Sequence, residues 1–312
     1  MFVLSFDINT GGQLVKNLEC LLKNGKIEYR KDEDVSRYST FKIGGVSAFA
    51  VFPSSADELC TAIKSALECG IKYEVVGNAS NVLFAFDRYE GAIIFTSKIF
   101  ECELEGDRIY AAAGVTLPHL SAIAKKAELS GFEFACGIPG RVGGSVYMNA
   151  GAHGSAISDV IEYSDAFDTK SGERIRVFEH NFDYRNSIYM QNKNLICLGA
   201  SFKLVRSSEN EIEEKIRQNI EKRKASQPLE YPSAGSYFKR PEGDFAGRLI
   251  EACGLKGERV GDAEVSEKHA GFIINRGNAT YSDVLALEEK IKERVMSSYG
   301  VMLCREVRLI EN

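Results

Sequence analysis

The chain contains no tryptophan, only six prolines and only four histidines among its 312 residues, and it has no excess of basic residues. Lys and Arg number 39 against 44 Asp and Glu, so the formal net charge is -5. Without a global positive field to attract phosphate backbones, we expect no nucleic-acid partner. The 44% of hydrophobic and 27% of charged residues are typical of a globular protein and exclude a disordered or fibrous chain.

The signatures of a metal site are also missing. The eight cysteines form no C-x-x-C pair, and no histidine stands at zinc-ligand spacing beside any of them. We therefore predict no metal site and interpret the cysteines as reduced packing residues. They occupy positions 20, 60, 69, 102, 136, 197, 253 and 304.

The N-terminal segment lacks the features of a leader or a membrane anchor. MFVLSFDINTGG has no basic start, reaches Asp7 early and is far shorter than the ~20 apolar residues that a membrane span needs. We expect a cytoplasmic protein without membrane contact. The sequence also has no G-x-S-x-G elbow, which disfavours a serine hydrolase.

Helix and strand patterns alternate in the first half of the chain, whose total length suggests about two domains. A charged run, Lys31 to Asp34, leads into a turn, and Val46 to Phe52 has the composition of a strand. A helix capped by Ser55 and a strand at Tyr73 to Val76 follow. We expect a further helix that begins after Thr116 and ends at Gly131.

The second half carries two strong helix patterns, at Glu209 to Lys224 and at Ser282 to Met296. The final run, Val301 to Ile310, alternates between apolar and polar residues strongly enough to predict a strand. No internal repeat or low-complexity segment is visible.

Two loops rich in glycine are the most informative segments. Gly77 to Asn81 follows a predicted strand and suits a phosphate, because small and amide residues let backbone N–H groups converge; a tight turn is the alternative. Gly137 to Gly154 holds too many glycines for an ordinary helix or strand. It is either a packed elbow or a place where main chain approaches a flat flavin ring closely.

Several polar residues outside these loops are candidates for chemistry. Tyr184 and Arg185 lie in a polar turn, and Ser236 is a hydroxyl flanked by aromatic residues. An alcohol can protonate a carbanion, although an isolated turn serine more often caps backbone groups. A glutamate on a strand such as Glu306 is expected to face the solvent. It could take part in chemistry only if its strand returned to a cleft.

The segments together closely resemble the UDP-N-acetylenolpyruvoylglucosamine reductase (MurB) family, whose motifs they match in order over nearly the whole chain. The glycine-rich stretch from 137 to 154 is the most specific match. The matching segments are YSTFKIGG (38–45), GNASN (77–81), GIPGRVGGSVYMNAGAHG (137–154), YRNS (184–187), AGSYFK (234–239), GLKG (254–257), 265–275 and EVR (306–308).

The resemblance implies an α+β fold: a two-subdomain FAD-binding fold of the vanillyl-alcohol-oxidase/PCMH type plus a C-terminal α+β substrate-binding domain. The first FAD-binding subdomain would cover residues 1–96, joined by the C-terminal strand 301–312. The second would cover 97–207, and the substrate-binding domain 208–300. The short segment between Tyr184 and Phe202 resembles the shorter subtype of the family, which lacks an extra substrate loop.

The resemblance also implies roles for individual residues. Ser236 is the expected proton donor, and Arg185 and Glu306 are the pair expected to stabilise the intermediate. Expected FAD-binding residues are Thr40, Gly44, Gly77, Asn78, Ala79, Ser80, Asn81, Gly137, Ile138, Gly140, Gly143, Gly144, Ser145, Asn149, Ala150 and Gly151. Expected substrate-binding residues are Tyr184, Lys239, Lys256, His269 and Asn275.

The implied activity is the reduction of UDP-N-acetylglucosamine enolpyruvate to UDP-N-acetylmuramate for peptidoglycan synthesis, with NADPH and non-covalent FAD as cofactors. NADPH would reduce FAD, and flavin N5 would deliver hydride to the enolpyruvyl methylene carbon. We expect a monomer. Two alternatives stay open: an oxidase or dehydrogenase with FAD bound covalently through His153 or His119, and a flavin- or UDP-sugar-binding module without turnover.

Overall fold

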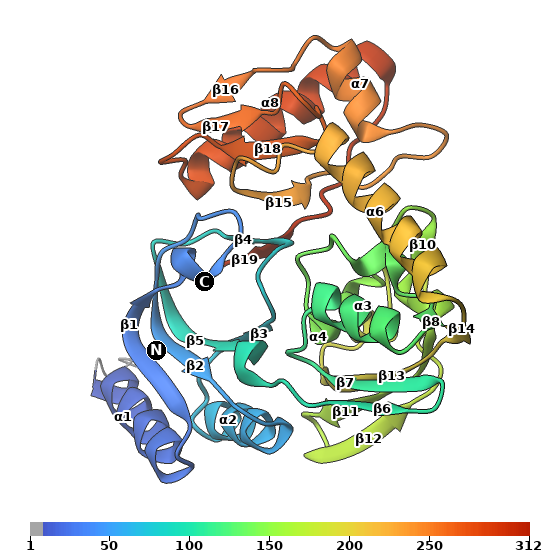
Figure 1. Cartoon of the computed structure of the whole chain (residues 1–312). Helices are drawn as coiled ribbons and strands as arrows, with labels where there is room; N and C mark the ends of the chain where they lie inside the picture. Colours follow the sequence, from blue (N-terminus) through green and yellow to red (C-terminus); the bar gives the residue numbers. More distant parts are fainter. Residues whose placement is uncertain (1–8) are drawn as a thin grey trace.

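The computed structural model describes residues 9–312, with side chains from residue 14 onward. Residues 1–8 lie outside the described residues. The expectation that the N-terminal segment is neither a leader nor a membrane anchor depends largely on them. Figure 1 shows three units, each built on its own β-sheet, with the last strand of the chain running back from the third unit to the first.

The first unit has a four-stranded sheet in the order β1-β2-β5-β3, in which β1 is antiparallel to β2 and the other pairs are parallel. Ser55 caps α2, which connects β2 to β3, by accepting a hydrogen bond from the Glu58 N–H. The helices α1 and α2 bury their apolar sides on one face of the sheet. The bounds are α1 Asn9–Asn24, β1 Glu28–Asp34, β2 Val46–Phe52, α2 Ala56–Glu68, β3 Tyr73–Val76 and β5 Arg88–Phe95.

The second unit has a five-stranded antiparallel sheet in the order β12-β11-β13-β7-β6, whose core is shared with α3 and α4. Two short ribbons, β8 with β14 and β9 with β10, flank it. The sheet strands are β6 Cys102–Glu105, β7 Arg108–Ala112, β11 Ile161–Asp168, β12 Glu173–Val177 and β13 Leu195–Lys203. The remaining elements are α3 Leu117–Lys126, β8 Leu129–Ser130, α4 Val142–Met148, β9 Gly151–Ala152, β10 Ser155–Ala156, α5 Ile188–Gln191 and β14 Val205–Arg206.

The third unit has a four-stranded antiparallel sheet in the order β15-β18-β17-β16, with α8 packed against it. The long helix α6 leads into this unit and contacts α3 of the second unit on its way. The bounds are α6 Glu209–Ser226, β15 Ser233–Ser236, α7 Ala246–Ala252, β16 Arg259–Val260, β17 Ala263–Val265, β18 Phe272–Asn275 and α8 Tyr281–Tyr299. Single 3-10 turns elsewhere lie at Val35–Tyr38, Thr96–Lys98, Glu133–Ala135 and Ile157–Asp159.

The last strand, β19 (Arg308–Ile310), belongs to the first unit although it follows the third in sequence. It pairs in parallel with β4 (Val82–Phe84), directly after the loop 77–81. The Arg308 guanidinium also contacts Glu74 of β3, with Nη2 and Oε2 2.6 Å apart. The chain between β18 and β19 therefore runs from the third unit to the first and brings residues 304–307 to the boundary between these two units.

Three of our expectations about elements were wrong in part. The stretch from Gly137 to Gly154 was expected to hold no ordinary helix or strand, yet it contains α4, which runs through Gly143 and Gly144, because the missing side chain at Gly143 lets this helix pack against Ala113. The helix after Thr116 ends at Lys126, because Glu128 adopts a positive φ of 56° and β8 follows. Only 308–310 of the predicted final strand is a strand, with Arg305 forming an isolated bridge to Phe238.

The cysteines are all free thiols. Cys60, Cys69 and Cys197 are buried as expected of packing residues, whereas Cys20 and Cys304 are exposed, so the packing interpretation fails for those two. Within residues 9–312 no helix is long and apolar enough to cross a membrane.

The returning strand generates a stability prediction. Ile310 of β19 is 2% exposed and packs in the aromatic core of the first unit, so Ile310→Ala should lower the free energy of unfolding by roughly 2–5 kcal/mol. The exposed neighbour provides a control, because Glu311→Ala should change it by less than about 0.5 kcal/mol. Urea unfolding followed by circular dichroism measures both. Equal effects of the two substitutions would mean that β19 is not part of the core.

Candidate active site

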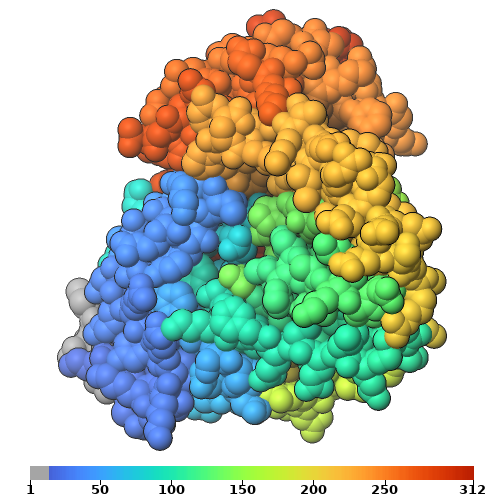
Figure 2. All heavy atoms as spheres, in the orientation of Figure 1, coloured from blue at the N-terminus to red at the C-terminus, as the bar shows by residue number. Residues whose placement is uncertain are grey.

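A cavity of about 1670 Å³ lies where the three units meet, and Figure 2 shows the surface hollowed there. Single drug-sized ligands occupy pockets of roughly 300–1,000 Å³, so this cavity has room for a larger molecule. Its walls come from the loop after β3, from α4 with its flanking loops, and from the segment 227–236.

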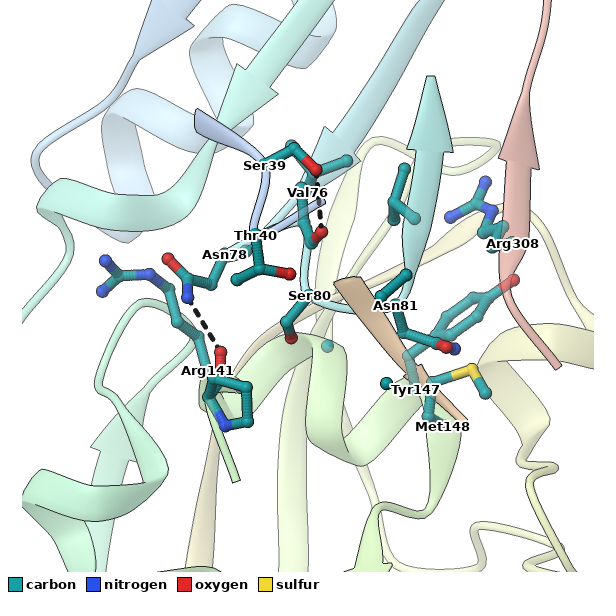
Figure 3. Close-up of a pocket in the computed structure, with 18 of the residues that line it drawn as sticks. Ser39, Thr40, Val76, Asn78, Ser80, Asn81, Arg141, Tyr147, Met148 and Arg308 are labelled. Atoms are coloured by element: carbon teal, nitrogen blue, oxygen red, sulfur yellow. Dashed lines mark hydrogen bonds between the residues drawn. The ribbon is translucent and has the colours of Figure 1, made fainter. Parts of the chain in front are cut away.

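The loop after β3 forms one wall. Residues 77–81 all line the cavity, together with Thr40 from the adjoining loop. Asn78 Nδ2 donates to the Pro139 carbonyl across the cavity at 2.9 Å, which ties this loop to the second glycine-rich segment. Ala79 adopts a positive φ of 44°, and Thr40 Oγ1 donates to the Ser233 carbonyl at 2.8 Å. Figure 3 shows Thr40, Asn78 and Ser80 facing the glycine-rich wall.

The glycines of the opposite wall serve two different purposes. A Cβ on Gly143 would lie 2.9 Å from the Cβ of Ala113, so this glycine allows α4 to pack against the loop after β7. A Cβ on Gly144 would meet no protein atom within 4 Å, because the position faces the open cavity. Gly144 therefore leaves room for a ligand rather than for protein packing.

Arg141 is a cation in this wall that lacks an acidic partner among the described residues. Its Nη1 donates to the Gly114 carbonyl at 2.5 Å, and its buried Nε has no hydrogen-bond partner. Burial lowers the pKa of Arg141 below its ordinary value. Because this Nε is shielded by protein atoms, Arg141 offers the cavity its positive charge rather than a free N–H, and that charge suits an anionic group of a ligand. Our prediction missed this residue, although a single arginine inside a run of glycines was the signal.

Arg185, Ser236 and Glu306 come together at one end of the cavity. A second pocket of about 510 Å³ adjoins it, and among the described residues these three are the ones that line both. They come from three segments: the turn after β12, the end of β15 and the segment before β19. The three predicted catalytic residues thus meet at the junction of two pockets.

Arg185 and Glu306 form an ion pair, with Nε and Oε1 2.6 Å apart. The guanidinium is also held by the Gly151 carbonyl, at 3.1 Å from Nη2, and the Tyr184 hydroxyl lies 3.4 Å from Glu306 Oε2. Arg185 itself adopts a positive φ of 52°, which turns it toward the cavity. Asn81 Nδ2 donates to the Glu306 backbone carbonyl at 3.2 Å, so the pair is connected to the loop after β3.

Ser236 is exposed, and its hydroxyl makes no hydrogen bond within the described part of the chain. The strand β15 has an irregular register with β18 between Ser233 and Ser236, and Gly235 in between has a φ of +80°. Such irregularities redirect a side chain. Here Ser236, which follows Gly235, faces the space beside Arg185 and Glu306.

The second pocket is lined by several cations and by two predicted substrate-binding residues, Tyr184 and His269. Burial lowers the pKa of His269, and its Nδ1 accepts the Gly271 N–H at 3.0 Å. Arg240 lies over the ring of Phe245, 4.5 Å from its centroid. Arg248, which is paired with Asp244, and Lys268 also line this pocket, and the cations outnumber the carboxylates of Glu251 and Glu306, which suits an anionic ligand.

Six predicted binding residues do not line either pocket. Gly44 packs against Phe84 and Gly137 against Arg223. The Asn149 side chain bonds the Asp183 carbonyl and the Ser158 N–H, and Asn275, 2% exposed, bonds the backbone of Phe41, Gly277 and Ala279. Lys256 pairs with Glu251 at 2.7 Å, and Lys239 lies outside both pockets. Gly44, Gly137, Asn149 and Asn275 therefore support the walls from within the protein.

The other predicted cofactor-binding positions all line the large cavity. They are Thr40, Gly77, Asn78, Ala79, Ser80, Asn81, Ile138, Gly140, Gly143, Gly144, Ser145, Ala150 and Gly151. Beyond Arg141, our prediction also missed Arg223 and Arg308, which contribute cations to the same cavity. Those two lie on helix α6 and strand β19, far from the glycine motifs in sequence.

Two families match different parts of the chain. Residues 47–177 match the family described as "FAD binding domain", and residues 227–310 match "UDP-N-acetylenolpyruvoylglucosamine reductase, C-terminal domain". The fold and the glycine-lined cavity define an FAD-binding protein with an added C-terminal domain.

Whole-length relatives give the family. The chain is 43% identical over 298 residues to the UDP-N-acetylenolpyruvoylglucosamine reductase of Caldanaerobacter subterraneus subsp. tengcongensis, which covers 95% of this chain and 98% of that protein. It is 42% identical over 310 residues to that of Clostridium novyi, covering 99% and 98%. The crystal structure of the Thermus caldophilus enzyme (MurB) aligns with a TM-score of 0.77 at 33% identity, over 91% of this chain and 99% of that one. This chain belongs to the UDP-N-acetylenolpyruvoylglucosamine reductase family, which confirms the family and the fold class that we expected.

The cavity fits FAD on its own geometry. Gly144 leaves open space where a side chain would stand, the 77–81 loop offers amide and hydroxyl groups, and Arg141 adds a positive charge that has no acidic partner among the described residues. A flat ring system with a diphosphate requires these three features. His119 and His153 are exposed and line neither pocket, so neither is placed for a covalent bond to a ligand there.

The contrast between Gly143 and Gly144 generates a prediction. Gly144→Ala should leave the apoprotein as stable as before or slightly more so, because alanine favours a helix over glycine by roughly 0.5–1 kcal/mol. It should weaken FAD binding, since overpacking costs about 1–3 kcal/mol, equivalent to roughly 5- to 150-fold in Kd. Gly143→Ala should instead destabilise the protein, because its Cβ meets Ala113. Thermal unfolding and flavin-fluorescence titration separate the two; a Gly144→Ala protein with unchanged FAD affinity would place the flavin elsewhere.

Proposed function

We propose that this protein is the NADPH-dependent, FAD-containing enzyme that reduces UDP-N-acetylglucosamine enolpyruvate to UDP-N-acetylmuramate, a step of peptidoglycan precursor synthesis. The observation that carries the proposal is the convergence of Arg185, Ser236 and Glu306 where the large cavity meets the cationic pocket. FAD occupies the first space and the anionic UDP-sugar the second. We further propose non-covalent FAD binding and a monomeric protein in the cytoplasm.

The large cavity holds the cofactor through complementary groups. The 77–81 loop provides donors and Arg141 a positive charge for the diphosphate, and the open space at Gly144 accommodates the flat ring. When bound, FAD supplies, from N5 after its reduction by NADPH, the hydride that is added to the methylene carbon of the enolpyruvyl ether.

Arg185 stabilises the negative charge that this addition places on the substrate carboxylate. Its guanidinium is fixed in place by Glu306 and by the Gly151 carbonyl before any substrate arrives. Donors that are oriented in advance contribute most to transition-state stabilisation, because they do not need to reorganise during the reaction. Glu306 keeps the guanidinium oriented and lets its remaining N–H groups face the substrate.

Ser236 donates the proton that completes the reduction at the adjacent carbon. Its hydroxyl has no competing hydrogen bond within the described residues, and it opens onto both pockets. A carbanion is basic enough to take a proton from an alcohol. Hydride and proton together saturate the double bond, so no further reactant is needed.

The substrate's diphosphate is proposed to lie in the second pocket. Arg240, Arg248 and Lys268 line it, and Tyr184 joins it to the Arg185–Glu306 pair. Charge-assisted bonds from arginine and lysine are the usual protein partners of phosphate groups. His269 lines the same pocket.

The activity is tested directly by absorption spectroscopy. Purified protein should show a flavin spectrum that NADPH bleaches and that UDP-N-acetylglucosamine enolpyruvate restores under anaerobic conditions. Acid precipitation should release the flavin into the supernatant. A protein that is never bleached by NADPH, or that retains flavin in the pellet, would overturn the reductase proposal or its non-covalent cofactor, respectively.

The role of Ser236 predicts an effect on one half-reaction only. Ser236→Ala should leave flavin reduction by NADPH nearly intact, because no carbanion forms in that half. Flavin reoxidation by the substrate should slow by roughly 10²–10⁴-fold, the usual contribution of a general acid. Stopped-flow absorbance measures each half separately. Equal slowing of both halves would reject the proton-donor role.

The role of Arg185 predicts that charge alone does not suffice. An ammonium cannot reproduce the planar fork that contacts both Glu306 and the Gly151 carbonyl. Arg185→Lys should therefore slow flavin reoxidation by the order of 10²–10³-fold, as expected for loss of one oriented donor. Lys268→Arg, a swap at another cation of the second pocket, is the control that should have a smaller effect. Near-normal reoxidation by Arg185→Lys would indicate simple electrostatic steering.

A further inference from the structure

Glu288 of helix α8 is a fully buried carboxylate that lines neither pocket. A buried charge is costly unless it is paired and hydrogen-bonded. Three donors surround this one: the Tyr237 hydroxyl at 2.7 Å from Oε2, the Arg305 Nε at 2.8 Å from Oε2 and 3.0 Å from Oε1, and the Lys292 Nζ at 2.5 Å from Oε1.

Two of these partners are the immediate chain neighbours of proposed catalytic residues. Tyr237 follows Ser236, and Arg305 precedes Glu306. The two segments run side by side: the Glu306 N–H donates to the Tyr237 carbonyl at 2.8 Å, and the Lys239 N–H donates to the Cys304 carbonyl at 2.8 Å. Phe238 and Arg305 form an antiparallel bridge.

Neighbouring side chains of extended backbone point in opposite directions. Ser236 and Glu306 face the pockets, whereas Tyr237 and Arg305 turn toward α8 and bind the same carboxylate. The Glu288 carboxylate therefore links the segment that carries Ser236 to the segment that carries Glu306. It does so on the side of these segments that points away from the pockets. It contacts neither substrate nor cofactor space.

We infer that Glu288 is a positioning residue, which fixes the distance between Ser236 and the Arg185–Glu306 pair. This inference rests on the proposed function, because it assigns Ser236 and Glu306 their roles. Hydrogen bonds between the two backbones set their pairing, and the shared carboxylate prevents the two segments from rotating or sliding relative to each other. Loss of about 1 Å of alignment lowers a rate by roughly 10²-fold.

Glu288→Gln is the informative substitution. A carboxylate has acceptor sites for all three donors, but an amide has one oxygen and two N–H groups, and Arg and Lys cannot accept hydrogen bonds. The amide oxygen can still accept from two donors, but the amide carries no charge to balance Arg305 and Lys292, and it puts an N–H group where Tyr237 and Arg305 now donate to Oε2, so the cluster must rearrange. We expect flavin reoxidation by the substrate to slow by on the order of 10- to 100-fold, while reduction by NADPH stays near the wild-type rate.

Glu289→Gln is the matched control. Glu289 is the next residue of α8 and also binds Lys292, at 2.9 Å, but its side chain is 65% exposed and contacts neither Tyr237 nor Arg305. Both half-reactions of this variant should match wild type. Rates are normalised to bound flavin, and thermal unfolding is recorded, so that a loss of folded protein is not mistaken for a loss of alignment.

Tyr237→Phe provides the same test if Glu288→Gln does not fold, because it removes one hydroxyl and leaves the ion pairs in place. It should also slow reoxidation selectively. Unchanged reoxidation, or equal slowing of both half-reactions, overturns the positioning role. If wild-type flavin is never reoxidised by the substrate, the proposed function itself fails, and the inference fails with it.

Discussion

The parallel pairing of β19 with β4 is the constraint on which the site depends. It brings the end of the chain back to the first unit immediately beside the loop 77–81, and Asn81 then bonds the Glu306 backbone. Without this pairing, the third unit would be attached to the rest through α6 with its following segment and through the contacts of the loop at Thr40 and Phe41. The catalytic carboxylate proposed here would have no fixed relation to the glycine-lined cavity.

The charges of the site follow from the same arrangement. The wall of the large cavity contains Arg141, which has no acidic partner among the described residues, whereas Arg185 is paired with Glu306. An unpaired cation favours binding of an anion, and a paired guanidinium is held still for a reaction. The roles that we propose for the two arginines differ because one has a carboxylate beside it and the other does not.

Local patterns predicted most of the individual elements and the loop 77–81, whereas the second glycine-rich stretch contains the helix α4 that its glycines were expected to exclude. The cap at Ser55, the strand at 73–76 and the helices around 209–224 and 282–296 were confirmed, since capping groups and apolar periodicity are local signals. The order of the motifs identified the family. Binding residues were less certain: Asn275 and Gly44 lie in matching motifs, yet their atoms are used for packing inside the walls.

The sequence by itself determined the glycine loops, the element types and the family, because backbone freedom and hydrophobic periodicity are properties of neighbouring residues. The tertiary structure decided which distant groups share a site. Arg185 meets Glu306 across 121 positions, and Glu288 gathers Tyr237 and Arg305 from two other segments. No local pattern encodes such meetings, since they depend on how the sheets pack and on where the last strand returns.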